Sequence, residues 1–288
     1  MADSGSTHRL HGKVAIVTGG GSGIGEAVCR ELGDRGAQVV VADINAEHAE
    51  RVAAAIARGG GLAEARQVDV SDAEEVQRLV DETTSGHGRL DYQFNNAGIA
   101  IGGDVRDLTA DHWRRVLDVD LNGVLYGTLA AYRVMTRQGS GHIVNTSSAA
   151  GLLPQPINAP YCTAKHAVVG LSLSLRLEGA DLGVNVSVVC PGYVRTSMYQ
   201  NVELVGLPRD VAGSGRAGVR MMEPAAAART ILDGVDRNQA VIAFPGYVPV
   251  IWRLTCLFPR LIDRPALRRV RQIRRRRTAP AQPGPAAE

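Results

Sequence analysis

Residues Lys13–Gly25, KVAIVTGGGSGIG, decide which fold this chain adopts. The run Lys13–Thr18 is mostly apolar and β-branched, which is typical of a buried strand. Apolar residues then recur through Gly25–Arg35 at the spacing of one helix face. The glycines between these two segments allow the backbone to turn sharply. The stretch therefore predicts a strand, a tight turn and a helix, the opening unit of an α/β domain.

Short apolar runs alternate with longer helical patterns along the rest of the chain. Further strands are predicted over Gln38–Ala42, Ala63–Val70, Arg89–Phe94, His142–Thr146, Asn185–Val189 and Gln239–Phe244. Helices are predicted over Ala46–Arg58, from Ser71 onward with Glu74 completing a capping box, over Asp111–Thr136 and over Tyr161–Leu182. Strands that are apolar on both faces indicate a parallel sheet covered by helices on both sides. We therefore predict a Rossmann-type, doubly wound α/β fold with about seven strands.

The same pattern suggests how the chain divides. No linker interrupts residues 12–245, which we interpret as a single Rossmann-type domain. Residues 1–11 are expected to be a flexible N-terminus, and residues 246–288 a basic amphipathic extension. The last stretch, residues 278–288, is rich in proline and alanine and is predicted to be disordered.

Charge is distributed unevenly over the 288 residues, whose formal net charge is +3. Residues 245–288 hold ten arginines against Asp263 and Glu288, a local net charge of +8, so the preceding 244 residues sum to −5. This excludes a uniformly basic nucleic-acid-binding surface for the body of the chain. Of the 32 basic residues, only Lys13 and Lys165 are lysines.

The cysteines and the N-terminal sequence indicate in which cellular compartment the protein is found. The four dispersed cysteines have neither metal-ligand spacing nor the number that a disulfide framework needs, and they are Cys29, Cys162, Cys190 and Cys256. Met1–His11 is polar and lacks the apolar core of a signal peptide. No apolar run reaches the roughly 18 residues of a spanning helix. We expect a cytoplasmic protein without a metal site.

The glycine-rich turn and an acidic residue after it predict a nucleotide cofactor. Thr18–Gly25 has the form Thr-Gly-xxx-Gly-x-Gly, in which glycine lets a pyrophosphate approach the backbone and the following helix directs N–H groups at the phosphates. Asp43 ends the second strand, 18 residues beyond Gly25. A carboxylate there accepts hydrogen bonds from the adenosine ribose hydroxyls and repels a 2′-phosphate. The pattern favours NAD over NADP.

Three polar residues indicate a proton-transfer site. Tyr161 and Lys165 are four residues apart on a predicted helix and so share a face. A phenol, with a pKa of about 10, is a poor acid or base at neutral pH. A neighbouring ammonium stabilises the phenolate and is expected to move the pKa of Tyr161 toward the working range. Ser148 follows the fifth strand, and its hydroxyl is suited to donate a hydrogen bond to a substrate carbonyl.

Together with four further motifs, these residues resemble a classical short-chain dehydrogenase/reductase over residues 10–245. The motifs, in family order and spacing, are TGGGSGIG at 18–25, Asp69-Val70 after the third strand, NNAG at 95–98, Ser148, YCTAK at 161–165, and Pro191-Gly192 with Val194 and Thr196. The combination is specific, although each motif alone is common.

The resemblance implies a role for each matching residue. Tyr161 would be the general acid/base, Lys165 would tune it and hold the nicotinamide ribose hydroxyls, and Ser148 would orient the substrate oxygen. Asp69 and the Val70 amide would meet the adenine. The full set of implied cofactor-binding residues is Gly19, Ser22, Gly23, Ile24, Gly25, Asp43, Asp69, Val70, Asn96, Gly98, Tyr161, Lys165, Pro191, Gly192, Val194 and Thr196.

One position departs from the family pattern. The segment Val119–Gly123 reads VDLNG, so Asp120 stands where the family usually has asparagine. In the family that asparagine supports a water molecule that links the active-site lysine to solvent. An aspartate holds the same water and adds negative charge near Lys165, so we predict that Asp120 takes part in the site as a catalytic residue.

The sequence says less about the substrate and about the function of the C-terminal extension. Residues 197–224 fall where the family has a mobile substrate loop, and the apolar residues expected to wall a substrate are Met198, Tyr199, Val202, Leu204, Val205 and Leu207. After Phe244 the family pattern stops, and an apolar stretch with Trp252 and Phe258 lies beside many arginines. This is typical of a helix at an anionic lipid surface. A contact with a partner subunit or a solvated tail are the alternatives, and no nucleic-acid partner is expected.

The sequence therefore predicts an NAD-dependent oxidoreductase that interconverts a secondary alcohol and a ketone by hydride transfer, with a hydrophobic, lipid- or steroid-like substrate. One alternative is a 3-oxoacyl thioester reductase, which Asp43 disfavours because biosynthetic reductases mostly use NADPH. Another is a non-catalytic NAD-sensing or scaffold protein, which the intact set Ser148, Tyr161 and Lys165 disfavours. The resemblance also implies a homodimer or homotetramer.

Overall fold

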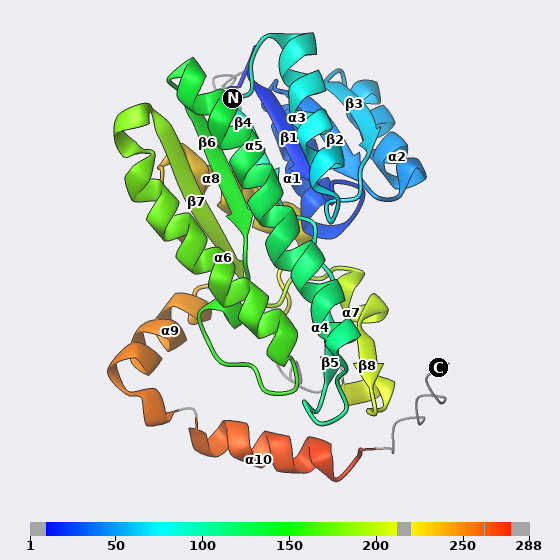
Figure 1. Ribbon diagram of the computed structural model, residues 1–288, viewed down its shortest axis with the longest axis vertical. Coiled ribbons are helices and arrows are strands. Elements are labelled where there is room, and N and C mark those ends of the chain that lie inside the picture. Colours follow the sequence, from blue (N-terminus) through cyan, green and yellow to red (C-terminus); the bar gives the residue numbers. More distant parts are fainter. Residues whose placement is uncertain (1–9, 212–219, 262, 278–288) are drawn as a thin grey trace, which may run out of the picture.

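Seven parallel strands form the central sheet of the protein, as Figure 1 shows. The structure is a computed structural model, and it describes residues 10–211, 220–261 and 263–277. The strands are β1 (Val14–Thr18), β2 (Gln38–Asp43), β3 (Leu62–Gln67), β4 (Tyr92–Asn95), β6 (Gly141–Thr146), β7 (Val184–Pro191) and β9 (Val241–Phe244). Their order across the sheet is β3-β2-β1-β4-β6-β7-β9. The predicted doubly wound, seven-stranded fold is confirmed.

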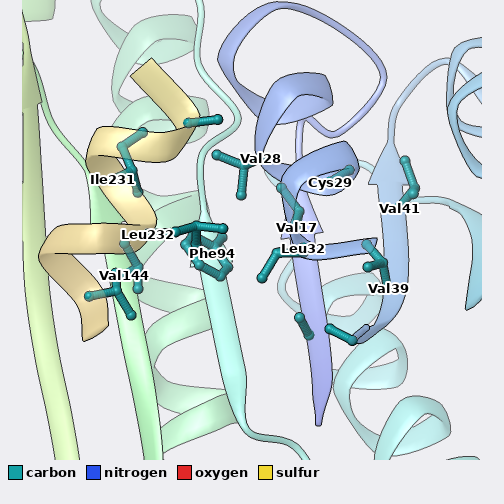
Figure 2. Close-up of a cluster of buried hydrophobic side chains, with 14 of the residues drawn as sticks. Val17, Val28, Cys29, Leu32, Val39, Val41, Phe94, Val144, Ile231 and Leu232 are labelled. Carbon is teal, nitrogen blue, oxygen red and sulfur yellow. The ribbon is translucent and has the colours of Figure 1, made fainter. Parts of the chain in front are cut away.

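Helices cover both faces of this sheet because successive strand residues point to opposite sides. On one face Val17 and Phe94 pack beneath α1 (Gly23–Asp34), α2 (Ala46–Arg58) and α8 (Pro224–Asp236) (Figure 2). On the other, Ile16 and Val40 pack beneath α3 (Ala73–His87) and α5 (Gly123–Gln138), and α6 (Ala159–Glu178) covers β7. Burial on both faces explains why central strands such as β1 and β2 are almost continuously apolar in sequence.

The predicted capping box at Ser71 is wrong. α3 begins at Ala73, and its N-cap is Asp72, whose carboxylate accepts hydrogen bonds from the amides of Glu74 at 2.8 Å and Glu75 at 3.0 Å. The Ser71 hydroxyl donates instead to Asp69 at 2.7 Å. A carboxylate at the next position satisfies two helix N–H groups, so it displaces the serine from the capping role.

The predicted helix over Asp111–Thr136 is interrupted. It comprises α4 (Ala110–Leu117), a π-helical turn over Asp118–Asn122, and α5. A π turn adds one residue to the helical repeat, and such turns are frequent at functional sites. This one holds Asp120, which is fully buried.

Several elements escaped the sequence analysis. Besides α8, they are β5 (Ile101–Gly103) and β8 (Glu203–Val205), which pair in parallel as a separate small sheet, and the short helix α7 (Met198–Asn201). The C-terminal extension forms α9 (Tyr247–Leu257) and α10 (Asp263–Arg274), which run along the lower edge of the molecule in Figure 1. The predicted disordered end and most of the predicted flexible N-terminus lie outside the described residues.

Candidate active site

A cleft opens where the central strands end. Its volume is about 360 Å³, and because the strands are parallel, the loops that follow them meet at this one edge of the sheet. The predicted cofactor-binding and catalytic residues that line it are Gly19, Ser22, Gly23, Ile24, Asp43, Val70, Asn96, Gly98, Ser148, Tyr161, Lys165, Pro191, Gly192, Val194 and Thr196. Gly25, Asp69 and Asp120 lie outside its lining. We call this space the glycine-turn cleft.

The glycine turn packs so closely that a side chain at either of two positions would collide with the protein's own backbone. A Cβ atom on Gly25 would lie 2.1 Å from the Gly19 carbonyl oxygen, and one on Gly19, whose φ is +63°, would lie 2.8 Å from Ala97 Cα. Asn96 braces the turn by donating to the Thr18 and Gly19 carbonyls at 3.1 and 3.3 Å. The N-cap Ser22 makes no side-chain cap bond, so the N-terminus of α1 faces the cleft with its amide groups. This geometry fits a pyrophosphate.

Two aspartates were predicted near the adenosine. Asp43 lines the cleft, and its carboxylate accepts hydrogen bonds from the amides of Gly21 at 2.9 Å and Asn45 at 3.0 Å. Asp69 lies against an adjoining depression of about 430 Å³, with its carboxylate bonded to Ser71. Asp43 is thus fixed at the end of β2 and lines the cleft. Asp69 does not line the cleft and lies in the adjoining depression.

Ser148, Tyr161 and Lys165 come together from two elements. Ser148 follows β6, and its hydroxyl accepts from the Ala150 amide at 3.1 Å. Tyr161 and Lys165 lie one turn apart near the start of α6, with the Lys165 Nζ atom 5.5 Å from the Tyr161 ring centre. Lys165 also donates to the Thr146 carbonyl at 3.1 Å. The predicted grouping of these three residues is present.

Asp120 forms a buried ion pair with Lys165. The Lys165 Nζ atom lies 3.0 Å from Asp120 Oδ2, and the two side chains are 3% and 0% exposed. Asp120 Oδ1 accepts from the Ile99 amide at 2.7 Å. A Cβ atom on Gly98 would lie 3.2 Å from Asp120 Oδ2. The pair therefore joins α6, the π turn and the loop after β4, and the glycine at 98 leaves it room.

This ion pair changes the electrostatics expected of Tyr161. The sequence pattern led us to expect that Lys165 moves the pKa of the phenol toward neutrality. Instead, burial and the Asp120 carboxylate raise the pKa of Tyr161 well above its usual range, while a hydrogen bond with Ser148 opposes the rise. The direction is opposite to the one expected, chiefly because the phenol is buried, and the Asp120 carboxylate adds to the rise.

A second space, the apolar cavity, adjoins the first. Its volume is about 470 Å³, and it shares Ser148, Tyr161 and Gly192 with the glycine-turn cleft. The predicted substrate-loop residues that line it are Met198, Tyr199, Val202 and Leu204. Val205 packs instead on Ile101 and Val116, and Leu207 on Val211 and Ile273. Successive residues of a strand point to opposite sides, so Leu204 of β8 faces the cavity and Val205 faces away from it.

Sequence reasoning missed residues at the rim of the cleft. Arg115 of α4 and Glu203 of β8 both line it and form an ion pair at 2.7 Å. Ile157 lines the apolar cavity with a φ of +72°, a left-handed conformation that is rare for a β-branched residue. Its carbonyl accepts from the Gly103 amide at 2.8 Å, which ties this loop to β5. The signal for Ile157 is geometric and leaves no trace in the sequence.

Comparison with known proteins identifies the family to which this sequence is similar. The family model for short chain dehydrogenase matches residues 13–204. Cyclohexanol dehydrogenase of Acinetobacter sp. (strain SE19) is 39% identical over 207 residues, which cover 70% of this chain and 82% of that protein. The 3-oxoacyl-[acyl-carrier-protein] reductase of Synechocystis sp. (strain ATCC 27184 / PCC 6803 / Kazusa) is 36% identical over 219 residues, covering 72% of this chain and 89% of that protein.

A solved structure is similar over most of the fold. The crystal structure of a short chain dehydrogenase/reductase from Burkholderia phymatum in complex with NAD matches with a TM-score of 0.80 and 28% identity. The match covers 88% of this chain and 95% of that one.

Proposed function

The chain belongs to the short-chain dehydrogenase/reductase family and is an oxidoreductase; on this basis we propose that it interconverts a hydrophobic secondary alcohol and its ketone with NAD. One observation supports the proposal above the others. Ser148 and Tyr161 line both the glycine-turn cleft and the apolar cavity. The two hydroxyl groups suited to proton transfer thus lie at the boundary between the proposed nucleotide site and the proposed substrate site.

Each residue has a distinct part in this scheme. The bound nicotinamide would supply or accept the hydride. The Ser148 hydroxyl donates a hydrogen bond to the substrate oxygen, and the Tyr161 hydroxyl moves the proton to or from that oxygen. Lys165 stands within reach of Tyr161 and presents an ammonium for ribose hydroxyls. An intact proton-transfer set of this kind supports an enzyme over a non-catalytic NAD-sensing or scaffold protein.

Asp43 supports NAD as the cofactor. Its carboxylate is held by two backbone amides at the end of β2 and lines the cleft. A fixed negative charge attracts ribose hydroxyls and repels a 2′-phosphate. The same preference favours an alcohol dehydrogenase over a 3-oxoacyl thioester reductase.

The lining of the apolar cavity supports a compact, cyclic alcohol as substrate. Aliphatic and aromatic side chains dominate it, among them Leu153, Met198 and Val202. Its volume of about 470 Å³ lies in the range of small-molecule sites. A relative of this chain is a cyclohexanol dehydrogenase. We therefore narrow the lipid- or steroid-like class expected from the sequence to alcohols with one or two rings.

Asp120 is proposed as a positioning residue that sets the pH range of the reaction. Its carboxylate contacts Lys165 and lies near Tyr161, but it does not line either cavity. Burial raises the pKa of Asp120, and the Lys165 ammonium and the Ile99 amide oppose that rise by favouring the carboxylate. As long as it is ionised, Asp120 disfavours the Tyr161 phenolate.

The exposed side of α9 is proposed as a contact with an anionic membrane surface. The large apolar residues that it leaves in solvent are Val250, Ile251, Leu254 and Leu257, followed by Phe258. Exposed arginines flank them at 253, 260 and 264. Apolar side chains beside basic ones suit the interface of anionic lipid. None of the described helices is long and apolar enough to cross a bilayer.

Removing the Tyr161 hydroxyl should separate chemistry from cofactor binding. Y161F is expected to lower kcat for cyclohexanol oxidation by roughly 10²–10⁴-fold, the usual worth of general acid–base catalysis, with little change in the Kd for NADH. Steady-state rates and NADH fluorescence titration measure the two. Y132F, on α5, is the matched control. Wild-type protein that binds NADH yet oxidises no alcohol in a broad panel would instead favour the scaffold function.

Removing the charge of Asp43 should weaken cofactor discrimination. D43N keeps an oxygen to accept from the Gly21 amide but no longer repels a 2′-phosphate, so we expect the preference in kcat/KM for NAD over NADP to fall by about tenfold, ~1.4 kcal/mol. Initial rates with both cofactors test this, with the exposed Asp34 as control in D34N. An unchanged ratio, or a wild type that prefers NADP, contradicts the assignment of Asp43.

Removing the charge of Asp120 should shift the pH profile. D120N relieves the repulsion that raises the pKa of Tyr161 and leaves the Lys165 charge uncompensated, so the phenolate forms at lower pH. The acid limb of kcat/KM for alcohol oxidation is expected to move down by about one pH unit. The control is D118N, which alters the same π turn at a residue bonded to Asn122. A profile that superimposes on the wild type argues against a role for Asp120.

The membrane proposal predicts binding that depends on charge and on the exposed apolar residues. Full-length protein should sediment with phosphatidylserine-containing liposomes at low salt and be released by about 0.5 M NaCl, since exposed charges are screened there. L257S/F258S should reduce the bound fraction, and L62S, at the far edge of the sheet, should not. If the double variant instead dissociates a dimer or tetramer in sedimentation velocity, the face belongs to the expected homo-oligomer and not to lipid.

A further inference from the structure

The C-terminal helix α10 reaches the apolar cavity from outside the family domain. The family model ends at residue 204, and α10 spans Asp263–Arg274. Pro265, Ala266 and Ile273 of this helix nevertheless line the apolar cavity together with Tyr247 and Val248. In Figure 1 the helix passes beneath β5 and β8 along the lower edge of the molecule.

Apolar packing holds one end of α10 on the body. Ile273 is 6% exposed and forms a cluster with Leu207 and Val211. Ile157 and Leu204, which also line the cavity, pack against the same cluster. A side chain buried in this way anchors the helix by the hydrophobic effect. The same residue thus both fixes α10 and walls the cavity.

Ion pairs hold the helix at the same end. Arg274 Nε lies 2.7 Å from Asp104 Oδ2, and Arg277 pairs with Asp107 through two hydrogen bonds. Both aspartates are buried and follow β5. Hydrogen bonds from Arg106 and Arg274 hold the pKa of Asp104 well below its usual range. Arg276 pairs in turn with Asp210 beside Val211.

We propose that α10 is the outer wall of the substrate site and determines how bulky an alcohol the enzyme accepts. Pro265, Ala266 and Ile273 of the helix line the cavity together with Arg269, and at its C-terminal end Arg274 and the following Arg277 pair with buried aspartates of the body. With α10 docked, the cavity is bounded on the side opposite the cofactor cleft, so a compact alcohol is enclosed and a bulkier one must displace the helix. This inference rests on the proposed function, since it assigns specificity to the same site.

Two pairs of variants isolate the docking of α10. R274Q/R277Q removes the arginines that pair with Asp104 and Asp107, and R268Q/R271Q removes two exposed arginines of the same helix as its control. I273S removes the buried anchor, and L267S alters an apolar residue that is 54% exposed. Each control makes the same type of substitution in the same helix as its partner variant, but at residues that do not make the docking contacts.

The readout is a series of cyclohexanols whose ring carries, opposite the hydroxyl carbon, a substituent of increasing size up to tert-butyl. For R274Q/R277Q and I273S we expect KM for unsubstituted cyclohexanol to rise by about fivefold with kcat little changed, because enclosure of the small substrate is lost. The specificity ratio, kcat/KM for the tert-butyl alcohol over that for cyclohexanol, should rise by about tenfold, ~1.4 kcal/mol. Both controls should stay within about twofold of the wild type.

Hydrogen exchange separates failure of this inference from failure of the proposed function. Amides of residues 263–274 should be protected in the wild type and in both controls, and should exchange at least about tenfold faster in R274Q/R277Q and I273S. Protection without any alcohol turnover overturns the function but leaves the docking. Alcohol turnover with an unprotected α10, or with an unchanged size preference in both docking variants, overturns the specificity role.

Discussion

Parallel pairing of the strands is the constraint on which the rest of the structure depends. It forces each connection to cross back over a face of the sheet, which explains the helices on both sides and the apolar strands between them. It also brings the loops after β1, β2, β4, β6 and β7 to one edge. Residues as distant in sequence as Gly19 and Thr196 therefore line one cleft, and no single segment contains the site.

The buried Lys165–Asp120 pair is the main electrostatic feature built on that edge. Two charges withdrawn from water are costly, and removing one partner of such a pair typically costs about 3–5 kcal/mol. Part of this cost is offset by the Ile99 amide, which donates to Asp120 Oδ1, and by the Thr146 carbonyl, which accepts from Lys165. Asparagine at position 120 would leave the lysine charge to act on Tyr161 alone. Aspartate shares that charge, so this chain retains the family's grouping with a different balance between phenol and phenolate.

Apolar periodicity predicted the parallel sheet and the glycine-rich turn predicted where the cleft begins, whereas most of the other cleft residues were implied by the resemblance to the family. The glycine turn does follow β1 and Asp43 does end β2, because both depend on local sequence. The π turn that directs Asp120, the pairing of β5 with β8 and the left-handed Ile157 were not foreseen. Each is decided by contacts between distant segments, such as the bond from the Gly103 amide to the Ile157 carbonyl. The effect of Asp120 on Tyr161 likewise needed distances, since the spacing of Tyr161 and Lys165 alone indicates the opposite shift.

The arginine-rich extension gains a different meaning from the positions of the acidic residues. In sequence, a local charge of +8 beside an apolar stretch suggests an external partner for the whole segment. In the structure, Asp104, Asp107 and Asp210 of the negatively charged body meet Arg274, Arg277 and Arg276. Part of the tail's charge is therefore matched within the molecule, at the end of α10 that also buries Ile273. What remains for an outside surface is the exposed side of α9 and the arginines around it. The extension thus has two faces, one that completes the apolar cavity and one that is exposed to solvent.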